Sequence, residues 1–181
     1  CNMISSVHDF KNPFFIGVAG VGMSAIAQYL KGIGKNVSGS DRFFVPGEYN
    51  EVKEKLTAAG IDCFVQNGEG ITAGTDLVVV STAIEDTVME VQKAKQLNIP
   101  IIRRSELLSV IALSKKTIAV GGTSGKSTTS AMLFDILEFA GLQPSIISGA
   151  GLISIIKSGK IGNAKVGAGE WLVVEADESD G

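Results

Sequence analysis

With 181 residues, 45% of them hydrophobic and 22 of them glycine, the chain has the composition of a globular α/β protein and differs clearly from disordered segments. A formal net charge of -3 gives no basic surplus for binding nucleic acid or an anionic membrane, so we expect small ligands whose phosphates are held by local geometry. The two cysteines, Cys1 and Cys63, lack metal-binding or CxxC spacing, and His8 is the single histidine, which argues against a disulfide framework, a zinc site or a histidine-based triad.

From residue 14 onward, short β-branched runs alternate with helical patterns. This alternation predicts an α/β fold in which parallel strands are joined by crossover helices, as in a Rossmann-like unit. The predicted strands are 14–18, 36–40, 62–64, 77–81 and 101–102. The predicted helices between them are 23–31, 51–59, 88–97 and 105–113.

The pattern restarts after Ser114 with a strand at 117–120, a glycine-rich loop and a helix that continues to Ala140. Strands are predicted at 145–147 and 171–175, and the stretch between them, 148–169, is expected to be loop with one short helix at most. We therefore expect a Rossmann-like domain over 1–114 and the first part of a P-loop-type α/β domain over 115–181. Because the chain stops just after a strand, it is typical of a fragment.

A glycine-rich run, GVAGVGMS at residues 17–24, follows the first predicted strand and opens the first predicted helix. Glycines at such a turn let backbone N–H groups approach a pyrophosphate at the positive end of the helix. Asp41, at the end of the second strand, is placed to accept hydrogen bonds from a ribose hydroxyl. Because Ala19 replaces the middle glycine of GxGxxG, the loop alone leaves two interpretations open: a site for a dinucleotide or nucleotide-sugar pyrophosphate, or a purely structural turn.

A second run, GTSGKST at residues 122–128, also lies between a strand and a helix. Its amides are suited to ATP phosphates, with Lys126 neutralising the β/γ oxygens and Ser127 as a Mg²⁺ ligand. The full GxxxxGK[ST] spacing is not met, because Val120 stands at the first glycine position, but the strand–GKS–helix context favours phosphate binding. The predicted ATP contacts are Gly122, Thr123, Ser124, Gly125, Lys126, Ser127 and Thr128.

The last predicted strand ends in four carboxylates, Glu175, Asp177, Glu178 and Asp180. Carboxylates this close repel one another unless a cation lies nearby, and Mg²⁺ prefers oxygen ligands. We therefore predict a Mg²⁺ ion held by Ser127 and Glu175. The other three carboxylates are open to either a direct role or a place in a solvated loop, and the predicted catalytic residues are Lys126, Ser127 and Glu175.

Three stretches together resemble the muramyl (Mur) ligases: residues 15–24 with 38–41, residues 122–129 and residues 175–180. Weaker matches extend the resemblance over nearly the whole chain, at 80–84, 104–108 and 163–169. The resemblance implies a three-domain enzyme whose first domain holds a UDP-sugar, whose middle domain holds ATP and whose third closes over both with the amino acid. Here the first would be present, the second partial and the third absent, so this length of chain is expected to be inactive by itself.

By this resemblance the first loop binds a UDP diphosphate rather than NAD. The implied UDP-sugar contacts are Gly17, Ala19, Gly20, Val21, Gly22, Met23, Ser24, Asp41 and Ser81. The alanine-adding branch is the nearer match, and it implies an ATP- and Mg²⁺-dependent joining of L-alanine to UDP-N-acetylmuramate through an acyl phosphate, in cytoplasmic peptidoglycan precursor synthesis. Ser124 stands where that branch usually carries His, so the recycling branch that attaches a whole tripeptide stays open.

Two functions of other classes are also compatible with parts of the sequence. An NAD-dependent oxidoreductase would use the first loop alone and would leave residues 122–129 unexplained. A non-catalytic nucleotide-binding module would use the second loop without joining substrates. A membrane partner is not expected, since the weakly polar run 16–27 is too short and too rich in glycine to span a bilayer.

Overall fold

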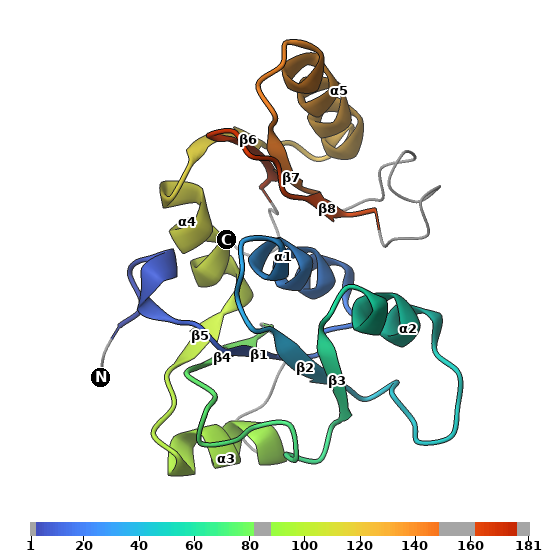
Figure 1. Ribbon diagram of the computed structural model, residues 1–181, viewed down its shortest axis with the longest axis vertical. Helices are drawn as coiled ribbons and strands as arrows, with labels where there is room; N and C mark the ends of the chain where they lie inside the picture. Colours follow the sequence, from blue (N-terminus) through green and yellow to red (C-terminus); the bar gives the residue numbers. More distant parts are fainter. Residues whose placement is uncertain (1–2, 82–87, 149–161, 177–181) are drawn as a thin grey trace.

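The computed structural model describes residues 3–81, 88–148 and 162–176, which form two β-sheets (Figure 1). The first sheet has five parallel strands in the order β3-β2-β1-β4-β5. Its strands are β1 (Pro13–Ile16), β2 (Ser38–Asp41), β3 (Asp62–Val65), β4 (Leu77–Val80) and β5 (Ile101–Arg103). This strand order matches the first five positions of the doubly wound Rossmann order 3-2-1-4-5-6, which confirms the predicted α/β fold class.

Helices cover both faces of this sheet (Figure 1). They are α1 (Val21–Gly32), α2 (Glu51–Ala58), α3 (Met89–Gln96) and α4 (Arg104–Leu113), and a short 3-10 helix, η1 (Val7–Asp9), precedes β1. Side chains alternate between the faces of a strand. Phe15 of β1 therefore packs in the core cluster of α1, α2 and α4, whereas Phe14 and Ile16 pack in the cluster of α3.

The second sheet is mixed, with the order β6-β9-β7-β8. It contains β6 (Lys116–Val120), β7 (Ser145–Ile147), β8 (Ala164–Lys165) and β9 (Trp171–Glu175), while α5 (Lys126–Phe139) follows β6. β6, β9 and β7 are parallel, and β8 runs antiparallel to β7. β8 is not among the predicted strands, and the short helix allowed within 148–169 falls largely outside the described residues.

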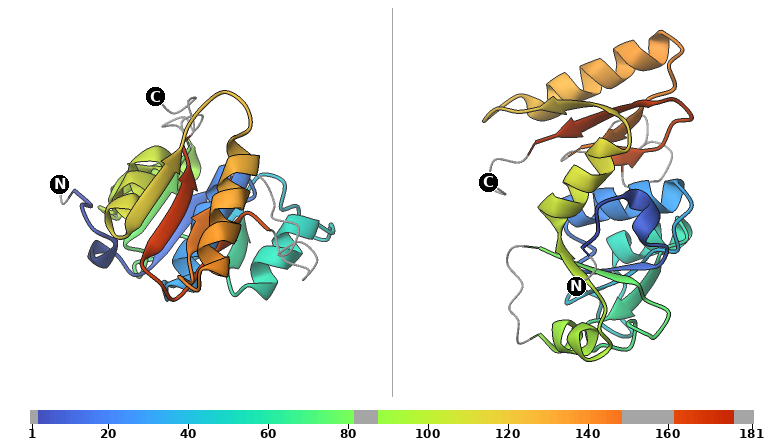
Figure 2. Two further views of the ribbon diagram at one scale, coloured as in Figure 1. Left: turned by 90° about the horizontal axis from the view of Figure 1, so that it is seen from above. Right: turned by 90° about the vertical axis from the view of Figure 1, so that its left-hand side faces the viewer.

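The two sheets share a packed layer of helices. Ile147, Leu172 and Val174 of the second sheet belong to the same core cluster as α1 and α4, while Ile146 and Val173 face Phe134 of α5. α1 thus lies between the two sheets, and α4 connects them along one side (Figure 2). This stacking directs the amino-terminal end of α1, which carries the first glycine loop, toward the second sheet.

The contact between α1 and β8 is close. A Cβ atom added to Gly32 would lie only 2.5 Å from Cγ2 of Val166, the residue after β8, so glycine is needed there for space. None of the helices in the described part of the chain combines the length and the apolar character that crossing a membrane would need.

Candidate functional site

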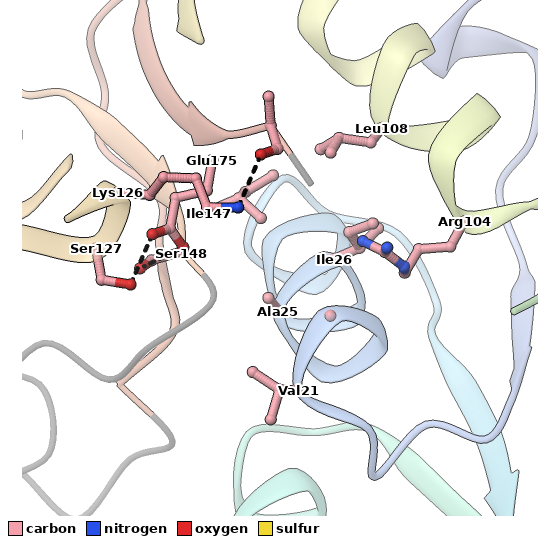
Figure 3. Close-up of a pocket in the computed structure, with 12 residues that line it drawn as sticks. Val21, Ala25, Ile26, Arg104, Leu108, Lys126, Ser127, Ile147, Ser148 and Glu175 are labelled. Carbon is pink, nitrogen blue, oxygen red and sulfur yellow. Dashed lines mark hydrogen bonds between the residues drawn. The ribbon is translucent and has the colours of Figure 1, made fainter. Parts of the chain in front are cut away.

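A cavity of about 320 Å³ lies between the two halves of the structure (Figure 3). α1 contributes Val21, Gly22, Ala25 and Ile26, and α4 contributes Arg104 and Leu108. The start of α5 and the ends of β7 and β9 contribute Lys126, Ser127, Ile147, Ser148, Glu175 and Ala176. The amino-terminal ends of both predicted phosphate-binding helices therefore open onto one space.

The second glycine loop adopts backbone conformations that require glycine. Gly122 has φ 121° and Gly125, the N-cap of α5, has φ 76°, both in the region that side chains disfavour. α5 begins at Lys126, so the N–H groups of Lys126, Ser127 and Thr128 lie in its first turn and have no partner within the helix. Such a turn is a ready anion site, because its free N–H groups and the helix dipole both favour negative charge.

Ser127, Glu175 and Ser148 converge at this end of the cavity (Figure 3). The Ser127 hydroxyl donates a hydrogen bond to Glu175 Oε1 at 2.7 Å, and the Ser148 hydroxyl donates to Oε2 at 3.1 Å. Lys126 Nζ donates to the carbonyl oxygen of Ala176 at 3.3 Å, which holds the ammonium group across the ends of the strands. The structure thus brings together the three residues predicted to be catalytic.

The donor set here fits a magnesium ion. It consists of one carboxylate and two hydroxyls, all hard oxygen ligands, and Mg²⁺ usually completes its shell with waters and substrate phosphates. Among the described residues, no cluster of three or more His, Cys, Asp or Glu side chains occurs that would form an all-protein metal cage. Asp177, Glu178 and Asp180 lie outside the described residues, so a role for each of them stays a prediction.

The first glycine loop differs from the sequence-based expectation in how its amides are used. The N–H groups of residues 17–20 all donate within the chain, to the carbonyl oxygens of Ser40 and Gly17 and to Asp41 Oδ2, at 2.8 to 3.1 Å. Gly17, Ala19 and Gly20 therefore have no free N–H for a diphosphate in this arrangement. The donors that remain are the first-turn amides of Val21, Gly22 and Met23, at the start of α1.

Asp41 holds the loop in this conformation. It is buried, and its two carboxylate oxygens accept hydrogen bonds from the amides of Ala19 and Phe43, each at 3.0 Å. Asp41 lies at the end of β2, as the sequence predicts. In the structure its carboxylate accepts hydrogen bonds from backbone amides of the chain itself. The ribose contact stays a prediction.

The remaining predicted contacts of the first loop are placed unequally. Met23 and Ser24 are 4% and 2% exposed, so their side chains are part of the core. The Ser24 amide donates to the carbonyl oxygen of Gly20, which leaves the backbone N–H of Met23 as the donor that this pair offers to a ligand. Ser81 is half-buried and directly follows β4, but it does not line the cavity, and residues 82–87 beside it lie outside the described residues. In the second loop, Gly122, Thr123, Ser124, Gly125 and Thr128 are exposed beside the cavity rather than lining it.

Two polar side chains that line the cavity, those of Arg104 and Ser148, are absent from the sequence-based set. The Arg104 side chain lies against the first loop: a Cβ atom on Gly22 would be 3.0 Å from its Nη1. Ser148 directly follows β7, and the ends of neighbouring parallel strands meet at one edge of a sheet. That rule would have identified Ser148, whereas nothing local marks Arg104 as a cavity residue.

Comparison with known proteins relates this arrangement to a family. A family model described as "Mur ligase family, catalytic domain" matches residues 14–116. UDP-N-acetylmuramate–L-alanine ligases of Mesorhizobium japonicum and Carboxydothermus hydrogenoformans are 42% and 44% identical over 167 and 168 residues, which is 92% of this chain and 34% of each relative. The chain therefore spans about a third of the length of these curated relatives.

Solved structures agree with this relationship. The crystal structure of UDP-N-acetylmuramate–alanine ligase from Thermotoga maritima matches with a TM-score of 0.77 and 31% identity, covering 94% of this chain and 37% of that one. A UDP-N-acetylmuramate:L-alanyl-gamma-D-glutamyl-meso-diaminopimelate ligase from Neisseria meningitides matches with a TM-score of 0.74 and 26% identity, covering 94% of this chain and 54% of that one.

Proposed function

Because the chain belongs to the Mur ligase family, we propose that the complete protein is an ATP-dependent ligase that joins L-alanine to UDP-N-acetylmuramate. The observation that carries the proposal is the single cavity in which Lys126, Ser127 and Glu175 face the start of α1. An amide-forming ligase needs its acceptor and its ATP phosphates within reach of each other, and this cavity offers an anion-binding helix end to each. A reaction that consumes these two nucleotides is expected in the cytoplasm.

In this proposal the work is divided between the two parts of the chain. Residues 1–114 hold the nucleotide sugar, with the first-turn amides of α1 facing its diphosphate, and residues 115–181 hold ATP through the loop at 122–128. Arg104 adds a second cation at the cavity, opposite Lys126. Two cations facing one space suit a reaction in which a carboxylate and a triphosphate must approach despite their like charge.

The proposed chemistry proceeds in two displacements. A carboxylate oxygen of the muramyl group attacks the γ-phosphorus of ATP and ADP leaves; the amine of alanine then attacks the acyl carbon and inorganic phosphate leaves. Lys126 would neutralise charge on the transferring phosphoryl group, and the first-turn amides of α5 would orient it. Ser127 and Glu175, with Ser148 beside them, would hold Mg²⁺, which supplies further charge neutralisation when bound. No side chain is required as a nucleophile.

The proposal is tested by measuring ADP formation by the full-length protein with UDP-N-acetylmuramate, ATP and Mg²⁺. We expect ADP to form when L-alanine is added and not when other single amino acids replace it. A protein that instead uses the tripeptide L-alanyl-γ-D-glutamyl-meso-diaminopimelate would belong to the recycling branch. That branch is the second candidate because Ser124 stands where the alanine-adding branch usually carries His. If no ADP formed with either L-alanine or the tripeptide, the proposed function would be overturned.

A further inference from the structure

A buried asparagine connects the two halves of the cavity. Asn163, just before β8, is 3% exposed. Its Nδ2 donates to the carbonyl oxygen of Val21 and to Ser24 Oγ, each at 3.0 Å, and its Oδ1 accepts a hydrogen bond from Gln28 Nε2 at 2.7 Å. All three partners lie on α1, so one side chain from the second half of the chain grips the first two turns of this helix.

The same residue also faces the predicted ATP site through its backbone. Its carbonyl oxygen accepts a hydrogen bond from the amide of Ser148 at 2.8 Å. The Ser148 hydroxyl in turn donates to Glu175, which accepts from Ser127 at the start of α5. An unbroken series of hydrogen bonds therefore runs from the amino-terminal end of α1 to that of α5.

Both ends of this series line the cavity. Val21 lines it at the end predicted to face the nucleotide sugar, and Ser148, Glu175 and Ser127 line it at the end predicted to face ATP and Mg²⁺. An asparagine with a purely structural role would not need to connect residues at both ends of the cavity, as Asn163 does. Because buried polar groups lose their bonds only at a high free-energy cost, a shift of α1 on ligand binding would be transmitted to Ser148 and Glu175.

We propose that Asn163 is a positioning residue that couples occupancy of the first glycine loop to occupancy of the ATP site. The inference rests on the proposed function, because it needs both ligands to bind. Binding of the nucleotide sugar against α1 fixes Val21 and Ser24, Asn163 keeps them in register with Ser148, and Ser148 keeps the Glu175 carboxylate oriented toward Ser127. Such coupling is reciprocal: ATP tightens binding of the nucleotide sugar by the same factor as the sugar tightens binding of ATP.

The test uses calorimetry on the full-length protein. The Kd for UDP-N-acetylmuramate is measured alone and in the presence of Mg²⁺ and a non-hydrolysable ATP analogue, for the wild type and for Asn163→Ala. We expect the ratio of the two Kd values to fall by about 3- to 10-fold in the variant, in the range of mutations that modulate coupling between sites. Lys165→Ala is the matched control and should keep the wild-type ratio, because this exposed β8 side chain pairs with Glu138 and lies over the Phe134 ring, both on α5 and outside the hydrogen-bond series.

A second variant tests the same series of hydrogen bonds in case Asn163→Ala does not fold. Gln28→Ala removes the hydrogen bond to Asn163 Oδ1 without altering a residue that lines the cavity, and it should lower the ratio in the same direction. An unchanged ratio in a variant that unfolds at the wild-type temperature would overturn the inference and leave the proposed function intact. A wild-type protein that binds neither ligand would overturn the proposed function and, with it, the coupling.

Discussion

Lys126 is the residue on which the proposed chemistry depends most. It begins α5, lines the cavity, and its ammonium group is held by the carbonyl oxygen of Ala176 at the end of β9. That contact keeps the positive charge of Lys126 at the carboxyl end of β9, beside the Ser127–Glu175 hydrogen bond. In the proposed mechanism this lysine would stabilise the charge that develops on the transferring phosphoryl group.

Replacing this lysine should separate catalysis from sugar binding. For Lys126→Ala in the full-length protein we expect kcat to fall by at least about 10²-fold, because preorganised electrostatic contacts of this kind contribute that much to a transition state. The Kd for UDP-N-acetylmuramate should stay within error of the wild type. Lys116→Ala removes an exposed lysine that pairs with Glu170, the residue before β9, and is the control for general loss of charge. Amide formation at the wild-type rate by Lys126→Ala would remove the residue from the mechanism.

Glu90 is a buried carboxyl group far from this chemistry, on α3. It is fully buried and accepts a hydrogen bond from the Ser40 hydroxyl at 2.7 Å. Burial raises the pKa of Glu90, and the hydrogen bonds from Ser40 and Gln66 oppose that rise only in part. The folded state therefore holds this proton more tightly than the unfolded state, so its contribution to stability is present at low pH and is lost as pH rises through the raised folded pKa.

This sign gives a pH-dependent prediction for Glu90→Gln, whose side chain does not titrate. Relative to wild type, the variant should gain unfolding free energy as the pH is raised from about 5, just above the ordinary glutamate pKa, to about 8. Urea unfolding of both proteins at the two pH values measures the difference. Glu48→Gln, at an exposed position, should show no such trend. A Glu90→Gln difference that is equal at both pH values would contradict the assignment.

At the scale of helices and strands, sequence patterns located nearly every element of the described structure. The strand predicted at 171–175 has the bounds of β9, and the helix predicted at 23–31 lies within α1. β-branched runs and glycine stops locate such elements because the start and end of a helix or strand depend mainly on residues that are close in sequence. β8 was missed because a strand of two residues carries no period of its own and exists only through its pairing with β7.

The candidate site shows the same limit. Lys126, Ser127 and Glu175 were identified because each is the end of a predicted strand or the start of a predicted helix. The use of the amides at residues 17–20 within the chain was not foreseen, because it depends on the Asp41 carboxylate turning back onto the loop. Arg104 and Asn163 were not identified either, since their roles come from the packing of α1 and α4 against the second sheet.

The junction of β1 and β2 offers a test of packing beside the first loop. A Cβ atom at Gly39 would lie 2.7 Å from Val18 Cβ and 2.8 Å from the Phe15 carbonyl oxygen, so β2 could accept one only by moving away from β1. We expect Gly39→Ala to lower the unfolding free energy by about 1–3 kcal/mol, the usual effect of overpacking a core. Gly74→Ala, whose added Cβ would meet no atom closer than 3.6 Å, should change it far less. Equal losses in the two variants would contradict this packing, and urea unfolding measures both.

For the whole molecule, the arrangement of the layers explains how two anion-binding helix ends come to face one cavity. α1 packs against the first sheet on one side and contacts β7 and β8 on the other (Figure 2). Its amino-terminal end and that of α5 therefore line the same cavity. Sequence alone predicted two phosphate loops but not the distance between them. A ligase reaction needs the two loops together, because the acceptor carboxylate must touch the γ-phosphate of ATP.

That contact can be followed with an isotope. When the full-length protein is supplied with UDP-N-acetylmuramate labelled with oxygen-18 in its muramyl carboxylate, together with ATP, Mg²⁺ and L-alanine, attack on the γ-phosphate makes a carboxylate oxygen part of the phosphate that is later released. Mass spectrometry of the inorganic phosphate should therefore show the label appearing in step with amide formation. Amide formation with unlabelled phosphate would contradict the account, because the carboxylate and the γ-phosphate would then never have been joined.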